Sequence, residues 1–173
     1  MRYGFTTGSC AAAASKAATY MLLTGKLKQN ITIQTPKGIL FHAEILEITR
    51  SEKEVTCAVK KDGGDDPDIT SGALIFSTVS FADKEEKTLK QHNGQLSGIC
   101  VEAMQEKQAV IHIDGGKGVG RVTKPGLDQP VGNAAINHVP REMIEKEVQE
   151  VCALADFCGV LHITISVPDG ERL

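Results

Sequence analysis

Residues 10–24 read CAAAASKAATYMLLT, a run in which alanine and long apolar side chains dominate. Thr7 or Ser9 could cap a helix at the start of this run, and Gly25 could end it. The stretch therefore predicts a helix over residues 10–24. Apolar residues occupy most of its sides, so we expect the helix to be buried on more than one side, with its alanines allowing close packing.

A second helix is predicted from Pro140 to about Phe157, because apolar residues recur there at helical spacing. Its apolar stripe consists of Ile144, Val148, Val151 and Ala155. Its other faces carry a set of glutamates that we interpret as a solvated surface, Glu142, Glu145, Glu147 and Glu150. A short helix is also expected over residues 96–104.

β-Prone segments make up much of the remaining pattern, at residues 31–35, 39–48, 55–59, 73–81, 109–113 and 160–167. A turn at Pro36-Lys37-Gly38 separates the first two, and the 39–48 strand is expected to contain a β-bulge. Runs of strands with two main helices predict the α+β class. We expect one domain over residues 1–173, with a mixed β-sheet and both helices packed on one face.

The composition excludes several classes of protein. A net charge of −3, a pI near 6.0 and the absence of tryptophan argue against a nucleic-acid partner. No apolar run approaches the ~20 residues that span a bilayer, and no signal peptide stands out. The five cysteines have no CxxC pair and no Cys/His ligand spacing, and the histidines have no metal-binding spacing. We expect a cytoplasmic protein with mostly reduced, buried thiols and no assigned metal site.

Residues 60–70, KKDGGDDPDIT, form an unusually acidic loop after a strand. Adjacent carboxylates repel one another unless a cation, a basic group or a bound proton compensates them. The loop is therefore expected to hold carboxylates at one place, although a plain exposed turn is an open alternative. The candidate catalytic residues are Asp62, Asp65, Asp66 and Asp68.

Two further stretches are candidate anion sites. The start of the first helix combines free N–H groups, hydroxyl groups and the positive end of the helix dipole. Residues 115–120, GGKGVG, follow a strand as a phosphate loop would, but they lack the Ser/Thr that follows the lysine of a P-loop. A plain cap and a tight turn are the alternatives. The candidate substrate-binding residues are Thr6, Thr7, Gly8, Ser9, Cys10, Gly118, Gly120, Thr123 and Lys124.

Several long motifs occur here in a characteristic order. They are YGFTTGSCAAAA at residues 3–14, KDGGDDPDIT at 61–70, GVGRVTKPGL at 118–127, PVG at 130–132, VPR at 139–141 and VPDGE at 167–171. Together they resemble the CbiD family, the cobalt-precorrin-5B C1-methyltransferases of anaerobic cobalamin biosynthesis. The resemblance covers nearly the whole chain.

The resemblance implies transfer of a methyl group from S-adenosylmethionine to ring carbon C1 of a cobalt-containing tetrapyrrole, cobalt-precorrin-5B, to give cobalt-precorrin-6A. This macrocycle carries acetate and propionate side chains, which suit the two candidate anion sites. Family members continue past Leu173 into a Gly/Thr-rich region that we associate with S-adenosylmethionine binding. The chain is therefore expected to be an N-terminal, substrate-side domain without that part.

Two other functions stay open on the sequence. One is a non-catalytic tetrapyrrole-binding module, and the other is a small-molecule kinase that would hold phosphate with residues 116–120. In the methyltransferase interpretation, the protein supplies positioning and a base or electrostatic partner. The acidic loop is the candidate for that partner. The sequence leaves the identity of the base, metal binding by the loop, and homo-oligomerisation undecided.

Replacing Asp66 with asparagine should lower methyl transfer at least tenfold, about 1.4 kcal/mol of activation free energy, if the acidic loop lines the reaction site. The substitution removes a charge at nearly constant volume, so the melting temperature should hardly change. Steady-state kinetics together with thermal melting would check this. Unchanged turnover would identify the loop as a plain turn.

Overall fold

The structure is a computed structural model that describes residues 6–61, 72–82, 109–116, 136 and 138–168. Within these ranges the chain forms two helices, α1 (Thr7–Thr24) and α3 (His138–Leu154). The strands are β1 (Asn30–Gln34), β2 (Leu40–Glu44), β3 (Leu46–Arg50), β4 (Glu54–Lys60), β5 (Leu74–Phe81), β6 (Val110–Gly115) and β7 (Val160–Ser166). The short helix expected over residues 96–104 lies outside the described ranges.

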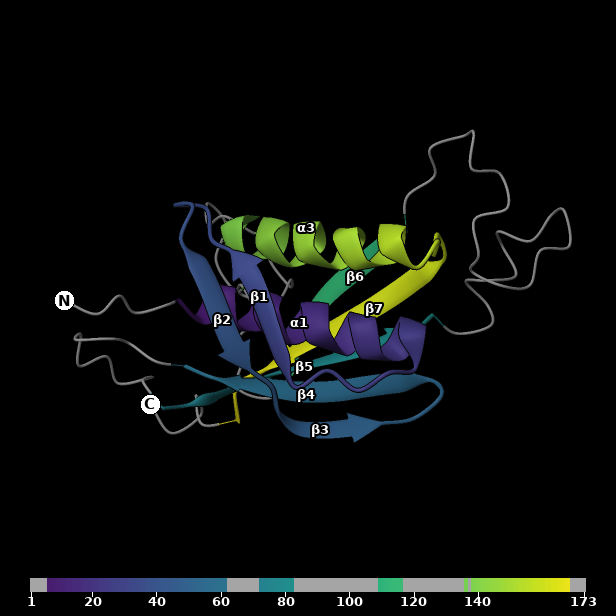
Figure 1. The fold of residues 1–173 in the computed structure, drawn as a ribbon, viewed down its shortest axis with the longest axis horizontal. Coiled ribbons are helices and arrows are strands. Elements are labelled where there is room, and N and C mark those ends of the chain that lie inside the picture. The colour runs from purple at the N-terminus through teal and green to yellow at the C-terminus, as the bar shows by residue number, and fades with distance from the viewer. Residues whose placement is uncertain (1–5, 62–71, 83–108, 117–135, 137, 169–173) are drawn as a thin grey trace, which may run out of the picture.

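The strands form a five-stranded sheet, in the order β3-β4-β5-β7-β6, and a separate β1-β2 hairpin. Neighbours in the large sheet are antiparallel except β6 and β7, which are parallel and are connected through α3. Both helices and the hairpin lie on the same side of the large sheet (Figure 1). The predicted α+β class with a mixed sheet is confirmed.

Helix α1 begins three residues earlier than predicted. Thr6 is extended and caps the helix, and its side-chain oxygen accepts a hydrogen bond from the N–H of Ser9 at 3.0 Å. The predicted caps, Thr7 and Ser9, are wrong because both residues already belong to the first turn. The predicted end is confirmed, since the N–H of Gly25 donates to the carbonyl of Met21 at 3.0 Å.

The expected burial of α1 on several sides is confirmed. On its sheet side, the Ser15 and Ser77 hydroxyl groups are 2.8 Å apart, and the Cys57 thiol of β4 donates to the carbonyl of Ala14 at 3.2 Å. Its other neighbours are α3 and the hairpin. Six of the eight buried alanines and serines of α1 are fully enclosed, Ala12, Ala13, Ala14, Ser15, Ala17 and Ala18. Larger side chains would hold these neighbours apart.

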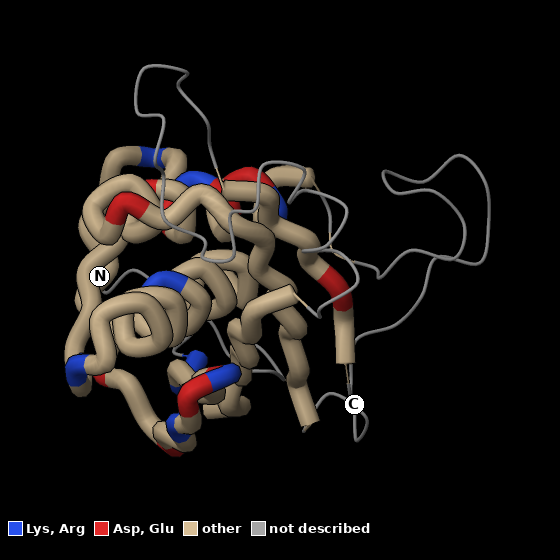
Figure 2. Tube along the Cα trace, turned by 90° about the vertical axis from the view of Figure 1, so that its right-hand side faces the viewer, with Lys and Arg blue, Asp and Glu red and all other residues tan. Residues whose placement is uncertain are grey.

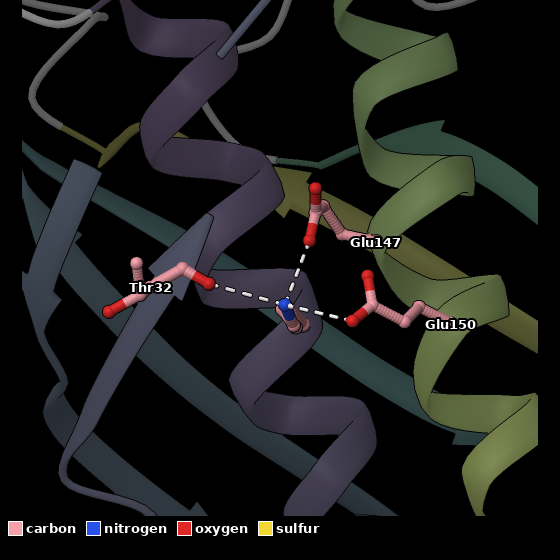
Figure 3. Close-up of polar contacts among 4 residues, drawn as sticks. Thr32, Glu147 and Glu150 are labelled. Carbon is pink, nitrogen blue, oxygen red and sulfur yellow. Dashed lines mark hydrogen bonds and ion pairs between the residues drawn. The ribbon is translucent and has the colours of Figure 1, made fainter. Parts of the chain in front are cut away.

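Lys16 is the single charged residue of α1, and it links three elements (Figure 3). Figure 2 shows where Lys and Arg (blue) and Asp and Glu (red) lie along the described chain. The ammonium nitrogen of Lys16 lies 2.9 Å from Glu147 Oε1 and 3.8 Å from Glu150 Oε1, both in α3. It also donates to the backbone carbonyl of Thr32 in β1 at 3.2 Å. One cation thus connects the hairpin, α1 and α3.

The predicted solvated glutamate face of α3 is wrong at Glu147, which is only 4% exposed. Burial of this carboxylate is tolerated because Lys16 of a neighbouring helix supplies the opposite charge. The predicted stripe is confirmed at Ile144, Val148 and Val151, which are buried. Ala155 falls just beyond the helix, and its N–H donates to the carbonyl of Val151 at 3.0 Å.

The segment predicted as one strand over residues 39–48 is two strands in different sheets. β2 pairs with β1, the chain leaves that pair at Ile45, and β3 then pairs with β4. The expected irregularity exists, but it lies between Leu46 and Thr49, where Glu47 has a positive φ of 51°. The prediction failed because the alternation of apolar and polar residues does not indicate which sheet each half of the segment joins.

Cys10, Cys57 and Cys152 are buried free thiols, as expected. Cys158 departs from the expectation because it is disulfide-bonded. Neither described helix has the length and apolar character needed to cross a membrane.

Ala12 lies between Gly8 and Lys16 on the side of α1 that faces α3, so Ala12→Leu should overpack this interface. We expect a loss of about 1–3 kcal/mol in unfolding free energy, measured by urea denaturation. Ala153→Leu is the matched control, since Ala153 is an exposed residue of the other helix. Equal effects of the two substitutions would contradict close packing of α1.

Stability should fall at alkaline pH, because burial raises the pKa of the Cys57 thiol from 9.0 to about 12 and that of Cys152 to about 11. Above about pH 9 the unfolded thiols ionise while the folded ones stay neutral, which favours unfolding by up to about 1.4 kcal/mol per pH unit for each thiol. Urea denaturation between about pH 8 and 10.5 should show that the unfolding free energy falls less steeply with pH for Cys57→Ala than for the parent chain. Equal slopes would refute this.

Candidate functional site

The two helices begin at the same end of the molecule. A Cβ added to Gly8, in the first turn of α1, would lie 3.0 Å from Pro140 Cγ in the first turn of α3. About two turns later, Lys16 meets Glu147 and Glu150. The helices therefore run in roughly the same direction, and both start on the left-hand side of Figure 1.

Three strands end where the helices begin. β4 and β7 are both antiparallel to β5, and β6 is parallel to β7, so the carboxyl ends of β4, β6 and β7 share one edge. Arg141 of α3 donates to the carbonyl of Ile113 in β6 at 3.2 Å, which places the helix starts beside this edge. We call this region the site end, and its described residues are 6–9, 60–61, 72–73, 115–116, 138–141 and 166.

The start of α1 supplies backbone donors to the site end. The N–H of Ser9 is bound by Thr6 Oγ1, and the N–H of Cys10 donates to the carbonyl of Thr6 at 3.1 Å. A helix leaves its first N–H groups without intrahelical acceptors. Of the first four N–H groups of α1, those of Thr7 and Gly8 are therefore the ones that remain for an anion.

The side chains at this start differ in access. Thr6 is exposed and Thr7 is half-buried, whereas Ser9 is 3% exposed and Cys10 is enclosed completely. The hydroxyl oxygens of Thr6 and Ser9 are 3.1 Å apart and hydrogen-bond to each other. Of the candidate substrate-binding residues here, Thr6 and Thr7 thus present side chains to solvent, and Cys10 contributes packing.

The glycine-rich stretch begins at the carboxyl end of β6. The N–H of Gly116 donates to the carbonyl of Ile165 in β7 at 2.8 Å, and a Cβ at Gly116 would lie 2.6 Å from Ser166 Oγ. Any other residue there would require the side chains of Ser166 and Thr164 in β7 to move. The candidates Gly118, Gly120, Thr123 and Lys124 lie outside the described residues.

The acidic stretch leaves and rejoins the same end of the sheet. The N–H of Lys61 donates to the carbonyl of Ala73 at 2.8 Å, and the N–H of Gly72 donates to the carbonyl of Lys61 at 2.7 Å. Lys61, directly before the aspartates, is only 8% exposed. The four candidate aspartates, Asp62, Asp65, Asp66 and Asp68, lie outside the described residues.

The described part of the site end favours negative ligands. Neither helix has an acidic residue in its first turn, so neither first turn supplies a side-chain counter-charge to the positive end of its own dipole. Lys60, Lys61 and Arg141 add positive charge, while Asp114 at the end of β6 and Glu142 next to Arg141 are described carboxylates nearby. Sequence reasoning missed Arg141 and Lys61, although both stand in the motifs VPR and KDGGDDPDIT.

No group of three or more His, Cys, Asp or Glu side chains gathers among the described residues, so they provide no metal centre. His112 and His162, on neighbouring parallel strands, stack with their ring centroids 5.2 Å apart. They lie in the middle of β6 and β7 rather than at the site end.

The fold is similar to a known one. A crystal structure titled as cobalamin biosynthesis protein (cbiD) from Archaeoglobus fulgidus matches 99% of this chain and 45% of its own, with a TM-score of 0.59 and 24% identity. The CbiD family model matches residues 1–173. The chain therefore belongs to the CbiD family.

Two relatives named cobalt-precorrin-5B C(1)-methyltransferase match over 173 residues. The protein from Geobacillus kaustophilus (strain HTA426) is 46% identical, and that from Thermoanaerobacter sp. (strain X514) is 47% identical. Each alignment covers all of this chain and 40% of the relative. The chain thus spans less than half the length of the relatives it matches.

Proposed function

We propose that this chain is the macrocycle-binding, N-terminal part of a cobalt-precorrin-5B C1-methyltransferase. The observation that carries the proposal is the match of residues 1–173 to relatives of that name at 46–47% identity. We place S-adenosylmethionine binding in the part of these longer relatives that this chain does not cover. The cytoplasmic location expected from the composition stays a prediction.

The substrate class suits the charge of the site end. A precorrin carries several acetate and propionate groups around a flat ring, so recognition requires several separate anion contacts. The N–H groups of Thr7 and Gly8 offer one such contact, supported by the hydroxyl groups of Thr6 and Thr7. The stretch that begins at Gly116 supplies the candidates Gly118, Gly120, Thr123 and Lys124 for another. Each contact is weak alone, and affinity comes from their sum.

The chemistry assigns a second task to the acidic stretch. In methyl transfer, an electron pair at ring carbon C1 attacks the methyl carbon, the carbon–sulfur bond breaks, and the sulfonium becomes a neutral thioether. Carboxylates near this reaction would balance the positive charge of the sulfonium or of the ring, or would take up a proton. Asp62, Asp65, Asp66 and Asp68 are our candidates, because their stretch is anchored at the site end.

The second candidate function is a tetrapyrrole-binding module without catalysis, which would use the same positive site end. Methyl transfer from labelled S-adenosylmethionine to cobalt-precorrin-5B separates the two. It should be measured with this chain alone and with the chain joined to the remaining length of a relative. Transfer by the joined protein supports the methyltransferase. Binding of the macrocycle without transfer in either form supports the module.

Lys124→Ala should weaken binding of a polycarboxylate cobalt corrin about 2–5-fold, which corresponds to one exposed charge contact of ~0.5–1 kcal/mol. It should also reduce the salt sensitivity of binding and leave S-adenosylmethionine binding unchanged. Calorimetric titration at two salt concentrations would measure this. Lys26→Ala is the matched control, because Lys26 is exposed just beyond the opposite end of α1. Equal effects of both substitutions would count against Lys124.

A further inference from the structure

Arg141 connects two segments at the site end. Its Nε donates to the carbonyl of Ile136 at 2.7 Å, and one terminal nitrogen donates to the carbonyl of Ile113 at 3.2 Å. Ile113 lies near the carboxyl end of β6, and Ile136 lies just before α3. The half-buried side chain of Arg141 therefore clamps the chain where it leaves the sheet and where it enters the helix.

Helix stability does not explain a positive charge at this place. A cation in the first turn opposes the helix dipole, and the first turn of α3 contains no acidic residue. The planar guanidinium can, however, donate in two directions fixed relative to each other, which the single ammonium group of lysine cannot reproduce. The geometry of the clamp is thus the property that requires arginine.

The clamp also reaches α1. Pro140, next to Arg141, contacts Gly8 closely enough that a Cβ there would lie 3.0 Å from Pro140 Cγ. Fixing the start of α3 against β6 therefore fixes the start of α1 as well. The candidates Gly118, Gly120, Thr123 and Lys124 stand between Ile113 and Ile136 in the sequence.

We propose that Arg141 is a positioning residue for macrocycle recognition, which acts through the carbonyls of Ile113 and Ile136 rather than by binding a substrate carboxylate. It sets the spacing between the donors at the start of α1 and the carboxyl end of β6. A flat ligand that is held by several anion contacts depends on that spacing. This inference rests on the proposed function of the site end.

The test measures binding of cobyrinic acid, a cobalt corrin with free acetate and propionate groups, by calorimetry at several salt concentrations. Arg141→Gln should weaken binding about tenfold, and Arg141→Lys, which keeps the charge, should weaken it nearly as much. The slope of log affinity against log salt should stay that of the parent chain in both variants. Arg50→Gln is the matched control, because Arg50 also donates to a carbonyl, that of Gly25 at 2.9 Å, at the far end of α1.

Three outcomes would overturn the proposal. Parent-like binding by Arg141→Lys would show that charge alone suffices, and a reduced salt slope in Arg141→Gln would indicate direct contact with a carboxylate. An equal loss of corrin affinity in Arg50→Gln would mean that a hydrogen bond from an arginine to a backbone carbonyl affects binding only through folding. Thermal melting of each variant measures the loss of stability separately from the loss of affinity. If the parent chain itself fails to bind the corrin, the proposed function fails first, and the role of Arg141 fails with it.

Discussion

The enclosure of α1 is the constraint on which the rest of the structure depends. The sheet, α3 and the hairpin all pack around this helix, and most of its buried side chains are small, which allows these neighbours to approach closely. Glycine at position 8 allows a close approach to Pro140. This contact brings the starts of two nearly parallel helices together beside the carboxyl ends of three strands, and it thereby creates the site end.

The Lys16 cluster adds geometric definition to this packing. A buried ion pair adds little net stability over apolar packing, since desolvation of both charges offsets their attraction. Removing one partner is costly, however, because the other is left buried without its counter-charge. Lys16 also binds a carbonyl of the hairpin, so it selects one placement of the hairpin and α3 around α1. The same placement keeps the starts of α1 and α3 side by side at the site end.

Much of the fold follows from the sequence, because periodicity and local caps report directly on elements such as α1, α3 and the strands. The errors arise where distant contacts decide. Glu147 is buried because Lys16 lies across from it, and the 39–48 segment divides because its halves join different sheets. The motifs of the candidate site were visible in the sequence. The sequence did not show that they start at the same end of the sheet, because that depends on the order and direction of the strands. Arg141 was missed as a site residue because its partners are backbone carbonyls far apart in the chain.

The central claim is that a polycarboxylate cobalt corrin binds at the end where both helices begin. Nuclear magnetic resonance of the labelled chain, titrated with a diamagnetic cobalt(III) corrin such as cobyrinic acid, tests it at each backbone amide. The account predicts the largest shift changes at Thr7, Gly8, Gly116 and Arg141, with little change at Gly25 or Arg50 beyond the other end of α1. Changes that gather around Gly25 and Arg50, with none at the helix starts, would contradict the account.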